Sequence, residues 1–230
     1  MLLQSELSQT RKSPIHHGPQ PGIVAIVFFS IFALGVIATL IMTHGSAFPR
    51  PNGSVGLAQQ YYLQYSTAVR LNGFLQYATS IPLGIFTAAV TSRLSFLGVT
   101  ASGVRIALFG GISASVFIAL SGLSAWVLSQ PEIANSISTM RAMQLFGFAT
   151  GGIGYVASLG LLLAGVSVPS LFGNVLPKWL AWTGLVIAGI AMLSTISLVF
   201  PQTYFLSALG RFPEFFWMIA AGFSLPRTKI

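Results

Sequence analysis

The sequence has no cysteine and very few acidic or histidine residues. Of its 230 residues, 11 are Lys or Arg, 3 are Asp or Glu and 3 are His. The absence of cysteine excludes disulfides, thiolate nucleophiles, Cys-ligated zinc and iron–sulfur clusters. The few carboxylates and histidines form neither an HExxH motif nor a pair at helical spacing. The sequence therefore predicts no catalytic residue, no metal site and no cofactor.

The shortage of charge also argues against a water-soluble fold. Charged residues make up 6% of the chain and hydrophobic residues 54%, whereas a soluble domain carries about 25% charged residues. The net charge of +8 comes from basic residues scattered singly at the ends of apolar stretches. Nucleic-acid binding requires a cluster of Lys and Arg, which is missing. We therefore predict an integral membrane protein that contacts lipids and binds no nucleic acid.

Six apolar stretches predict an all-α bundle of six transmembrane helices, because about 20 apolar residues in a helix cross a bilayer. They cover residues 23–42, 71–90, 106–128, 142–166, 179–200 and 215–225. The sixth stretch is short, so its helix either thins the bilayer or is re-entrant. We expect this helix to begin at Pro213, with Glu214 near the positive end of its dipole. The predicted domains are a tail at 1–22, a transmembrane domain at 23–226 and a C-terminal end at 227–230.

The basic residues predict the orientation of the bundle. Seven fall on the side of the N-terminus, namely Arg11, Lys12, Arg93, Arg105, Lys178, Arg227 and Lys229, and four on the other side, namely Arg50, Arg70, Arg141 and Arg211. Since basic residues are enriched in cytoplasmic loops, we predict that both termini are cytoplasmic. The long connection at 45–69 contains Tyr61, Tyr62 and Tyr65, which suit the membrane–water interface. A short helix lying flat on the membrane is expected there.

An internal repeat is indicated by three arginines. Arg70, Arg141 and Arg211 recur about every 70 residues, each where an even-numbered helix is expected to begin, which predicts three consecutive helical hairpins. Pro82 interrupts the second stretch at the position where the fourth stretch has Gly151. Breaks at matching repeat positions are typical of transporter binding sites. The alternative is that the glycines allow close helix packing, within the chain or between copies of it.

Helical geometry selects the candidate ligand-binding residues. At about 100° per residue, polar side chains of the second and fourth stretches lie opposite Arg70 and Arg141, on faces expected to turn inward. These candidates are Asn72, Gln76, Thr79, Ser80, Thr150 and Ser158. Alternatively, the Ser and Thr hydroxyls bond only to carbonyls of their own helix. Because the polar faces are expected to turn inward, Arg70, Arg141 and Arg211 are expected to face lipid and to anchor on lipid headgroups. Convergence of the three on an anion is the other hypothesis.

Two function classes remain open. Proton-coupled transport usually requires Asp, Glu or His in the middle of a span, and the predicted spans have none away from their ends. The first hypothesis is an accessory, sensing or packing component with a protein partner or a homo-oligomer contact through small-residue faces. The alternative is a permease or binding bundle for a small neutral or amphiphilic solute.

Two segments carry a resemblance to a known family. Residues 176–184, LPKWLAWTG, are followed by Ala188-Gly189, and RLNGFLQYATSIPLG begins at Arg70. Together they resemble a family of uncharacterised bacterial multi-pass membrane proteins of about six helices. The resemblance implies location in the bacterial inner membrane and no assigned activity.

Overall fold

A computed structural model describes residues 15–228, and the regular elements in this range are all helices. The predicted all-α fold is therefore confirmed. The elements are α1 (Pro21–Met42), α2 (Val55–Gln64), α3 (Ser66–Phe96), α4 (Ser102–Leu128), α5 (Pro131–Asn135), α6 (Ile137–Phe148), the π-helix η1 (Ala149–Gly154), α7 (Tyr155–Gly173), α8 (Lys178–Leu193), the 3-10 helices η2 (Ser194–Leu198) and η3 (Pro201–Thr203), and α9 (Phe205–Ser224). Most of the predicted tail, residues 1–14, lies outside the described residues, as do 229–230.

Five segments of the described chain are long and apolar enough to cross a membrane. They are Pro21–Met42, Ser66–Phe96, Ser102–Leu128, Ile137–Gly173 and Lys178–Leu198. Each contains or nearly matches one of the first five predicted stretches. The helices extend further than the apolar runs because their polar ends remain helical beyond the hydrocarbon thickness. These five helices give the chain the character of an integral membrane protein.

The last helix differs from the prediction. α9 begins at Phe205, so Arg211, Pro213 and Glu214 lie inside it and not at its start. Its charged residues keep it out of the five apolar spans. The predicted start at Pro213 was wrong because we assumed that both charges must lie outside the membrane. The described structure instead surrounds them with protein, as shown below.

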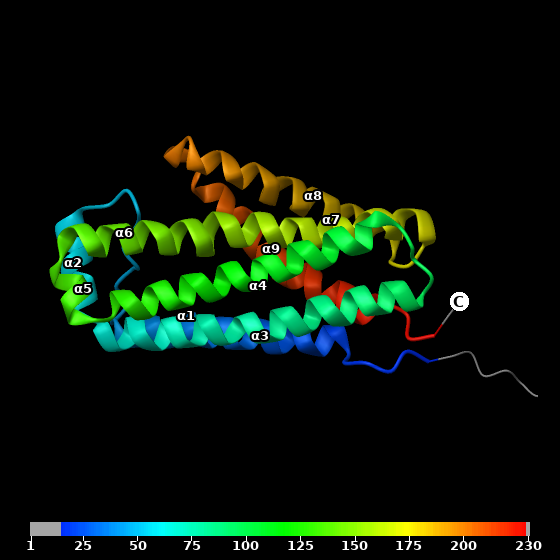
Figure 1. Cartoon of the computed structure of the whole chain (residues 1–230), viewed down its shortest axis with the longest axis horizontal. Coiled ribbons are helices and arrows are strands. Elements are labelled where there is room, and N and C mark those ends of the chain that lie inside the picture. Colours follow the sequence, from blue (N-terminus) through cyan, green and yellow to red (C-terminus); the bar gives the residue numbers. More distant parts are fainter. Residues whose placement is uncertain (1–14, 229–230) are drawn as a thin grey trace, which may run out of the picture.

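The long helices form a closed ring in chain order. α1 packs on α3, α3 on α4, α4 on α6, η1 and α7, α7 on α8, and α8 on α9, which returns to contact α1. Figure 1 shows these helices running along one axis, with α2 and α5 covering one end of the bundle. α9 meets α1 through Phe215, whose ring centroid lies 5.3 Å from that of Phe28 and 5.0 Å from that of Phe32. Trp217 of α9 donates a hydrogen bond of 2.8 Å to the Leu180 carbonyl oxygen of α8.

Glycines bring neighbouring helices into close contact. A Cβ atom at Gly73 of α3 would lie 2.8 Å from the Gly122 carbonyl oxygen of α4, and one at Gly103 of α4 would lie 2.8 Å from the Gly165 carbonyl oxygen of α7. No side chain fits at such distances, so these positions require glycine. Small residues are the usual means of close helix approach in membranes. The packing interpretation of the small-residue faces thus holds within this chain.

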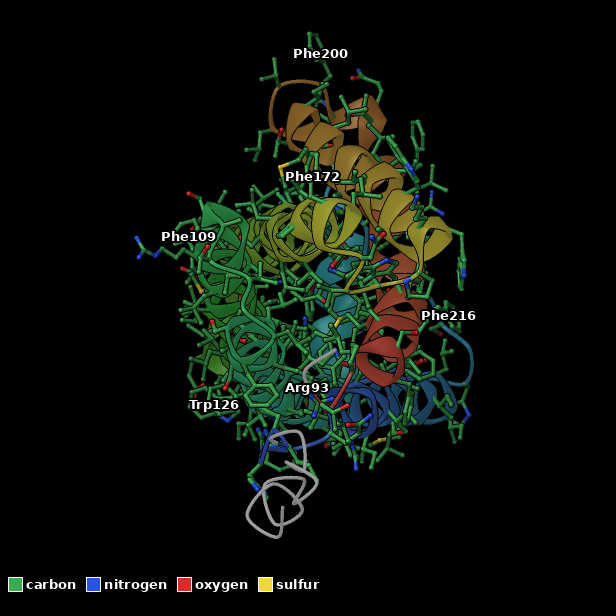
Figure 2. All side chains as sticks on the ribbon, turned by 90° about the vertical axis from the view of Figure 1, so that its right-hand side faces the viewer. Arg93, Phe109, Trp126, Phe172, Phe200 and Phe216 are labelled. Atoms are coloured by element: carbon green, nitrogen blue, oxygen red, sulfur yellow. The ribbon has the colours of Figure 1, made fainter. Side chains whose placement is uncertain are left out.

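Both described ends of the chain lie at the end of the bundle opposite α2 (Figure 1). Ile15 and Thr228 form an antiparallel bridge. The buried Arg93 side chain, labelled in Figure 2, donates hydrogen bonds to Gln20 Oε1 at 3.0 Å and to the Leu225 carbonyl oxygen at 3.4 Å. Arg93 thus ties the segment before α1 to the segment after α9.

The outer surface is rich in large apolar side chains. Figure 2 shows Phe109, Trp126, Phe172, Phe200 and Phe216 projecting outward around the bundle. Phe172 is 85% exposed and Phe109 64%. Soluble monomers rarely expose such large contiguous apolar surfaces, whereas hydrocarbon chains of lipids solvate them. The apolar surface and the five long apolar helices therefore both indicate a membrane protein.

The expected short helix between the first two spans is present as α2, and its two tyrosines are buried by protein. Tyr62 is fully buried and Tyr61 is 6% exposed. Their rings contact one another and Phe48 in edge-to-face geometry, with centroids 5.6 to 5.9 Å apart. The side chains of Tyr61 and Tyr62 are therefore covered by the connection that folds back over the end of the bundle, which the spacing of the tyrosines in the sequence does not show.

Candidate binding site

Two adjoining cavities lie in the half of the bundle nearest α2. The larger has a volume of about 360 Å³ and lies among α3, α4, α6, η1 and α9. The smaller, of about 270 Å³, lies between α1, α2 and α3 and also reaches α9. The two cavities share four lining residues, Phe48, Asn72, Gln76 and Arg211. We call these four residues the shared wall.

Two of the predicted ligand-binding residues belong to this wall. Asn72 and Gln76 lie on the inward face of α3 and line both cavities. Gln76 Nε2 donates a hydrogen bond of 3.0 Å to Ser121 Oγ of α4, and Ser121 Oγ donates one of 3.0 Å to the Gly147 carbonyl oxygen of α6. These two hydrogen bonds fix the orientation of the Gln76 amide group and therefore the direction of its Oε1 atom. The sequence argument identified the correct face of α3.

The other four candidates are not among the lining residues of these cavities. Three bond within their own helix: Thr79 to the Gln76 carbonyl oxygen at 2.6 Å, Ser80 to that of Tyr77 at 2.6 Å, and Thr150 to that of Phe146 at 2.8 Å. Such bonds to the preceding turn are the local alternative considered above. Ser158 is buried in α7, where its carbonyl oxygen faces Gly110 of α4.

The three arginines that led us to predict a repeat occupy three different environments. Arg70 is exposed and donates a hydrogen bond of 3.3 Å to Ser129 Oγ. Arg141 is half-buried and donates to Gln144 Oε1 at 2.8 Å and to the Pro51 carbonyl oxygen. Arg211 lies in the shared wall and donates to the Gly151 carbonyl oxygen. The arginines therefore do not converge on one point.

Lipid anchoring fits the exposure of Arg70 but not the positions of Arg141 and Arg211. Arg141 is covered by the connection before α2, which the helical geometry of α6 alone does not show. Arg211 lies inside α9 because that helix starts earlier than predicted. For Arg211, the expected outward orientation is thus replaced by an inward one.

The π-helix η1 explains how Arg211 is held. Residues 149–154 include Gly151, Gly152 and Gly154, so the break predicted in this helix is a π-helical segment. A π-helix shifts backbone hydrogen bonds from i−4 to i−5 and often marks a functional site. The Gly151 carbonyl oxygen accepts a hydrogen bond from Arg211 Nη2. The aromatic rings of Tyr155 and Phe32 lie 5.2 and 5.9 Å from the guanidinium carbon, at cation–π distance.

The site combines one cation with unpaired polar atoms. Arg211 is the only charged residue lining either cavity in the described part of the chain. Its Nε atom and the Ser207 Oγ atom are buried and have no hydrogen-bond partner among residues 15–228. Leaving a buried donor unpaired costs about 1 to 3 kcal/mol. The two donors therefore favour a bound group with acceptor atoms.

Two tyrosines add neutral hydroxyl groups. Tyr61 lines the smaller cavity and Tyr62 the larger. Burial raises the pKa of Tyr61 and raises that of Tyr62 further. Both phenols therefore remain protonated near neutral pH and contribute no negative charge to the site. The remaining lining is mostly apolar, including Val36, Leu40, Leu128, Phe148 and Phe212.

Glu214 is a residue that the sequence argument missed. It lies near the middle of α9 and is fully buried, and both carboxyl oxygens lack a hydrogen-bond partner among the described residues. Glu214 was expected at the start of the last helix, whereas it lies inside α9. The available signal was the apolar run 205–210, which precedes Arg211 and extends the helix toward the N-terminus. In the described range, no group of three or more His, Cys, Asp or Glu residues is placed to hold a metal ion.

The comparisons with known proteins add no relatives. No known protein family, curated protein or solved structure matches the chain.

Proposed function

We propose that this chain is a membrane-embedded binding protein or permease for an amphiphilic solute with an anionic or strongly hydrogen-bond-accepting group. The observation that carries the proposal is the shared wall, where Arg211, Asn72 and Gln76 face two cavities. Arg211 Nε and Ser207 Oγ supply unpaired donors. Binding sites for small molecules are typically apolar cavities with a few placed polar groups. The sequence alone indicated a neutral or an amphiphilic solute. The position of Arg211 in the cavity wall favours an amphiphilic solute with a negatively charged polar group.

The membrane arrangement that accompanies this function is also a proposal. Six passes, with α9 as the sixth, and three consecutive hairpins are supported by the closed ring and by the bridge between Ile15 and Thr228. The excess of basic residues at the end with the termini supports a cytoplasmic position for both. The resemblance to bacterial multi-pass proteins supports the inner membrane as the location.

Binding of a probe with fixed charge tests the proposal. Octanesulfonate, added to the purified protein in maltoside detergent, is expected to raise the thermal unfolding temperature saturably, because a ligand that binds only the folded state stabilises it. Octyl glucoside, which has the same chain length and no charge, is expected to do so far less. Gln76→Ala and Arg211→Gln are expected to lose the response.

The matched control is Ser80→Ala, since Ser80 lies on the same helix but bonds only to its own backbone. This variant is expected to respond like the wild type. Equal stabilisation of all four proteins, or none of the wild type, would refute the proposed site.

An accessory or packing role is the second candidate. It is favoured by α8, where Gly189 is exposed and a Cβ atom there would meet no atom within 4 Å. Trp182 and Val186 of the same helix are 61% exposed. An exposed glycine among large apolar side chains allows the close approach of a helix from a second copy or a partner. Gly189→Leu would then abolish a defined oligomer or complex in native mass spectrometry while leaving octanesulfonate binding unchanged.

A further inference from the structure

Arg211 and Glu214 are two ionisable residues of opposite type on one face of α9, inside the bundle. Residues three apart on a helix are neighbours on its surface. Glu214 is fully buried, and its two carboxyl oxygens have no partner among residues 15–228. The Arg211 guanidinium is turned toward Gly151 and the cavities, and its Nε atom is unpaired. Both groups thus have unused bonding capacity one helical turn apart.

The surroundings of Glu214 contain few other titratable groups. α9 packs against α1, α7, α8, η1 and η2. Of these elements, α1, η1 and η2 have no titratable residue, and α8 has only Lys178, which is exposed at its start. α7 contributes Tyr155, whose hydroxyl is buried and unpaired. The local charge balance therefore depends on Arg211 and Glu214, with Tyr155 as the remaining proton donor.

We infer that the protein takes up one proton at Glu214 for each anionic group that binds at Arg211. This inference rests on the proposed function, since it concerns the same cavities. Without solute, the Glu214 carboxylate balances the Arg211 cation. When an anion binds at Arg211, it becomes the partner of the cation, and the Glu214 carboxylate takes a proton from water to form a neutral carboxyl group. Release of the solute reverses both steps.

The reason for the coupling is the cost of net charge in the interior of a membrane protein. An uncompensated charge in such an environment is expensive, and charges there are paired or neutralised. Arg211 with an ionised Glu214 has no net charge, and Arg211 with a bound anion and a protonated Glu214 has none either. Arg211 with both anions would leave one negative charge without a partner. The same argument predicts that an uncharged solute binds without proton uptake.

The test measures octanesulfonate affinity between pH 5 and pH 9 in nanodiscs. A sulfonate stays ionised over this range, so any pH dependence belongs to the protein. For the wild type we expect affinity to fall by about tenfold per pH unit over the window in which Glu214 titrates, because one proton is linked to one ligand. Glu214→Gln is expected to bind with pH-independent affinity. Tyr155→Phe is expected to keep the pH dependence of the wild type.

A second readout does not require a variant. Addition of octanesulfonate to wild-type protein in weakly buffered solution is expected to remove about one proton per bound ligand. Difference infrared spectra should show the carbonyl stretch of a carboxylic acid. Saturable binding with no proton uptake, or a pH dependence that Glu214→Gln retains, overturns this inference and leaves the proposed function intact. Absence of saturable binding at every pH overturns the proposed function itself.

Discussion

Arg211 shows how a single charge can be placed inside an apolar bundle. Its guanidinium has a backbone carbonyl oxygen from η1, two aromatic faces and an acid on the next helical turn. The carbonyl oxygen and the Tyr155 ring come from η1 and the first residue of α7, and the Phe32 ring comes from α1. The sequence places Arg211 at the end of a span, and only the folded ring shows what surrounds it. Residues such as Asn72 and Gln76, in contrast, were predictable because helical periodicity alone puts them on the inner face of α3.

At the residue scale, comparing Ser207 with Ser124 tests whether a buried hydroxyl serves a ligand or stabilises the fold. Its Oγ atom is buried without a partner in the described structure, so Ser207→Ala is expected to raise the free energy of unfolding by about 1 kcal/mol without ligand. The same change should weaken octanesulfonate binding. Ser124→Ala removes a hydrogen bond of 2.8 Å to the Met143 carbonyl oxygen and should lower stability by about 1 kcal/mol. Chemical unfolding in detergent measures both. Equal losses in the two variants would contradict this assignment.

Tyr62 gives a second prediction at this scale. Burial raises the pKa of Tyr62 in the folded chain, whereas an unfolded tyrosine titrates near pH 10. The folded state therefore holds this proton more tightly, and its stabilising contribution is complete below about pH 10 and is lost as the pH rises above it. Tyr62→Phe should lose less stability than the wild type between pH 9 and pH 11.5. A Tyr62→Phe variant that loses as much stability as the wild type over this range would contradict the prediction.

At the scale of elements, apolar length predicted the first five long helices closely and the last one too short. Long runs such as 23–42 and 106–128 are recognisable because bilayer thickness sets their length. α9 was truncated in the prediction because Arg211 and Glu214 interrupt its apolar run. The π-helix was detectable only as a group of glycines, since a helix that adds one residue to a turn keeps the same composition. Local composition therefore identifies where a helix is irregular. It does not identify the backbone carbonyl oxygen that becomes available to a side chain such as Arg211.

The π-helix gives a prediction of its own. A Cβ atom at Gly151 would collide with Ser121 of α4, so Gly151→Ala must displace α4 or the π-helical turn. We expect a loss of about 1 to 3 kcal/mol and weaker ligand binding, since the Arg211 contact moves. Gly189→Ala is the matched control, because a Cβ atom there meets nothing within 4 Å. It should be neutral or gain up to about 1 kcal/mol. Similar unfolding temperatures for the two variants would argue against the role of Gly151.

At the scale of the whole molecule, the helices form a ring, and the two described ends of the chain meet at one end of the bundle. The ring order follows the chain order, so hairpins of neighbouring helices were predictable from short connections. The closing contact of α9 on α1 depends on Phe215 and its partners Phe28 and Phe32. Sequence periodicity does not show which distant helices meet. The cavities lie where this closure brings α9 beside α3, so their composition could not be predicted either.

The proposed orientation has a direct test, because the chain contains no cysteine. Thr100→Cys lies at the end with the termini, and Asn52→Cys lies near the opposite end, and both positions are exposed. In intact bacterial cells, a membrane-impermeant maleimide should label Asn52→Cys from outside the inner membrane. It should label Thr100→Cys only after the membrane is opened. The reverse pattern would invert the orientation, and labelling of both from outside would contradict the six-pass arrangement.

Protection of a cysteine introduced inside the larger cavity tests the central claim most directly. Ala208 lines this cavity beside Arg211, and Ala208→Cys supplies the only thiol in the protein. Octanesulfonate at saturating concentration should slow its reaction with a small methanethiosulfonate reagent at least about tenfold, since at ten times Kd a competing ligand occupies most sites. Octyl glucoside should not protect it. An unchanged rate, while octanesulfonate still stabilises the protein, would place the ligand elsewhere and contradict the account.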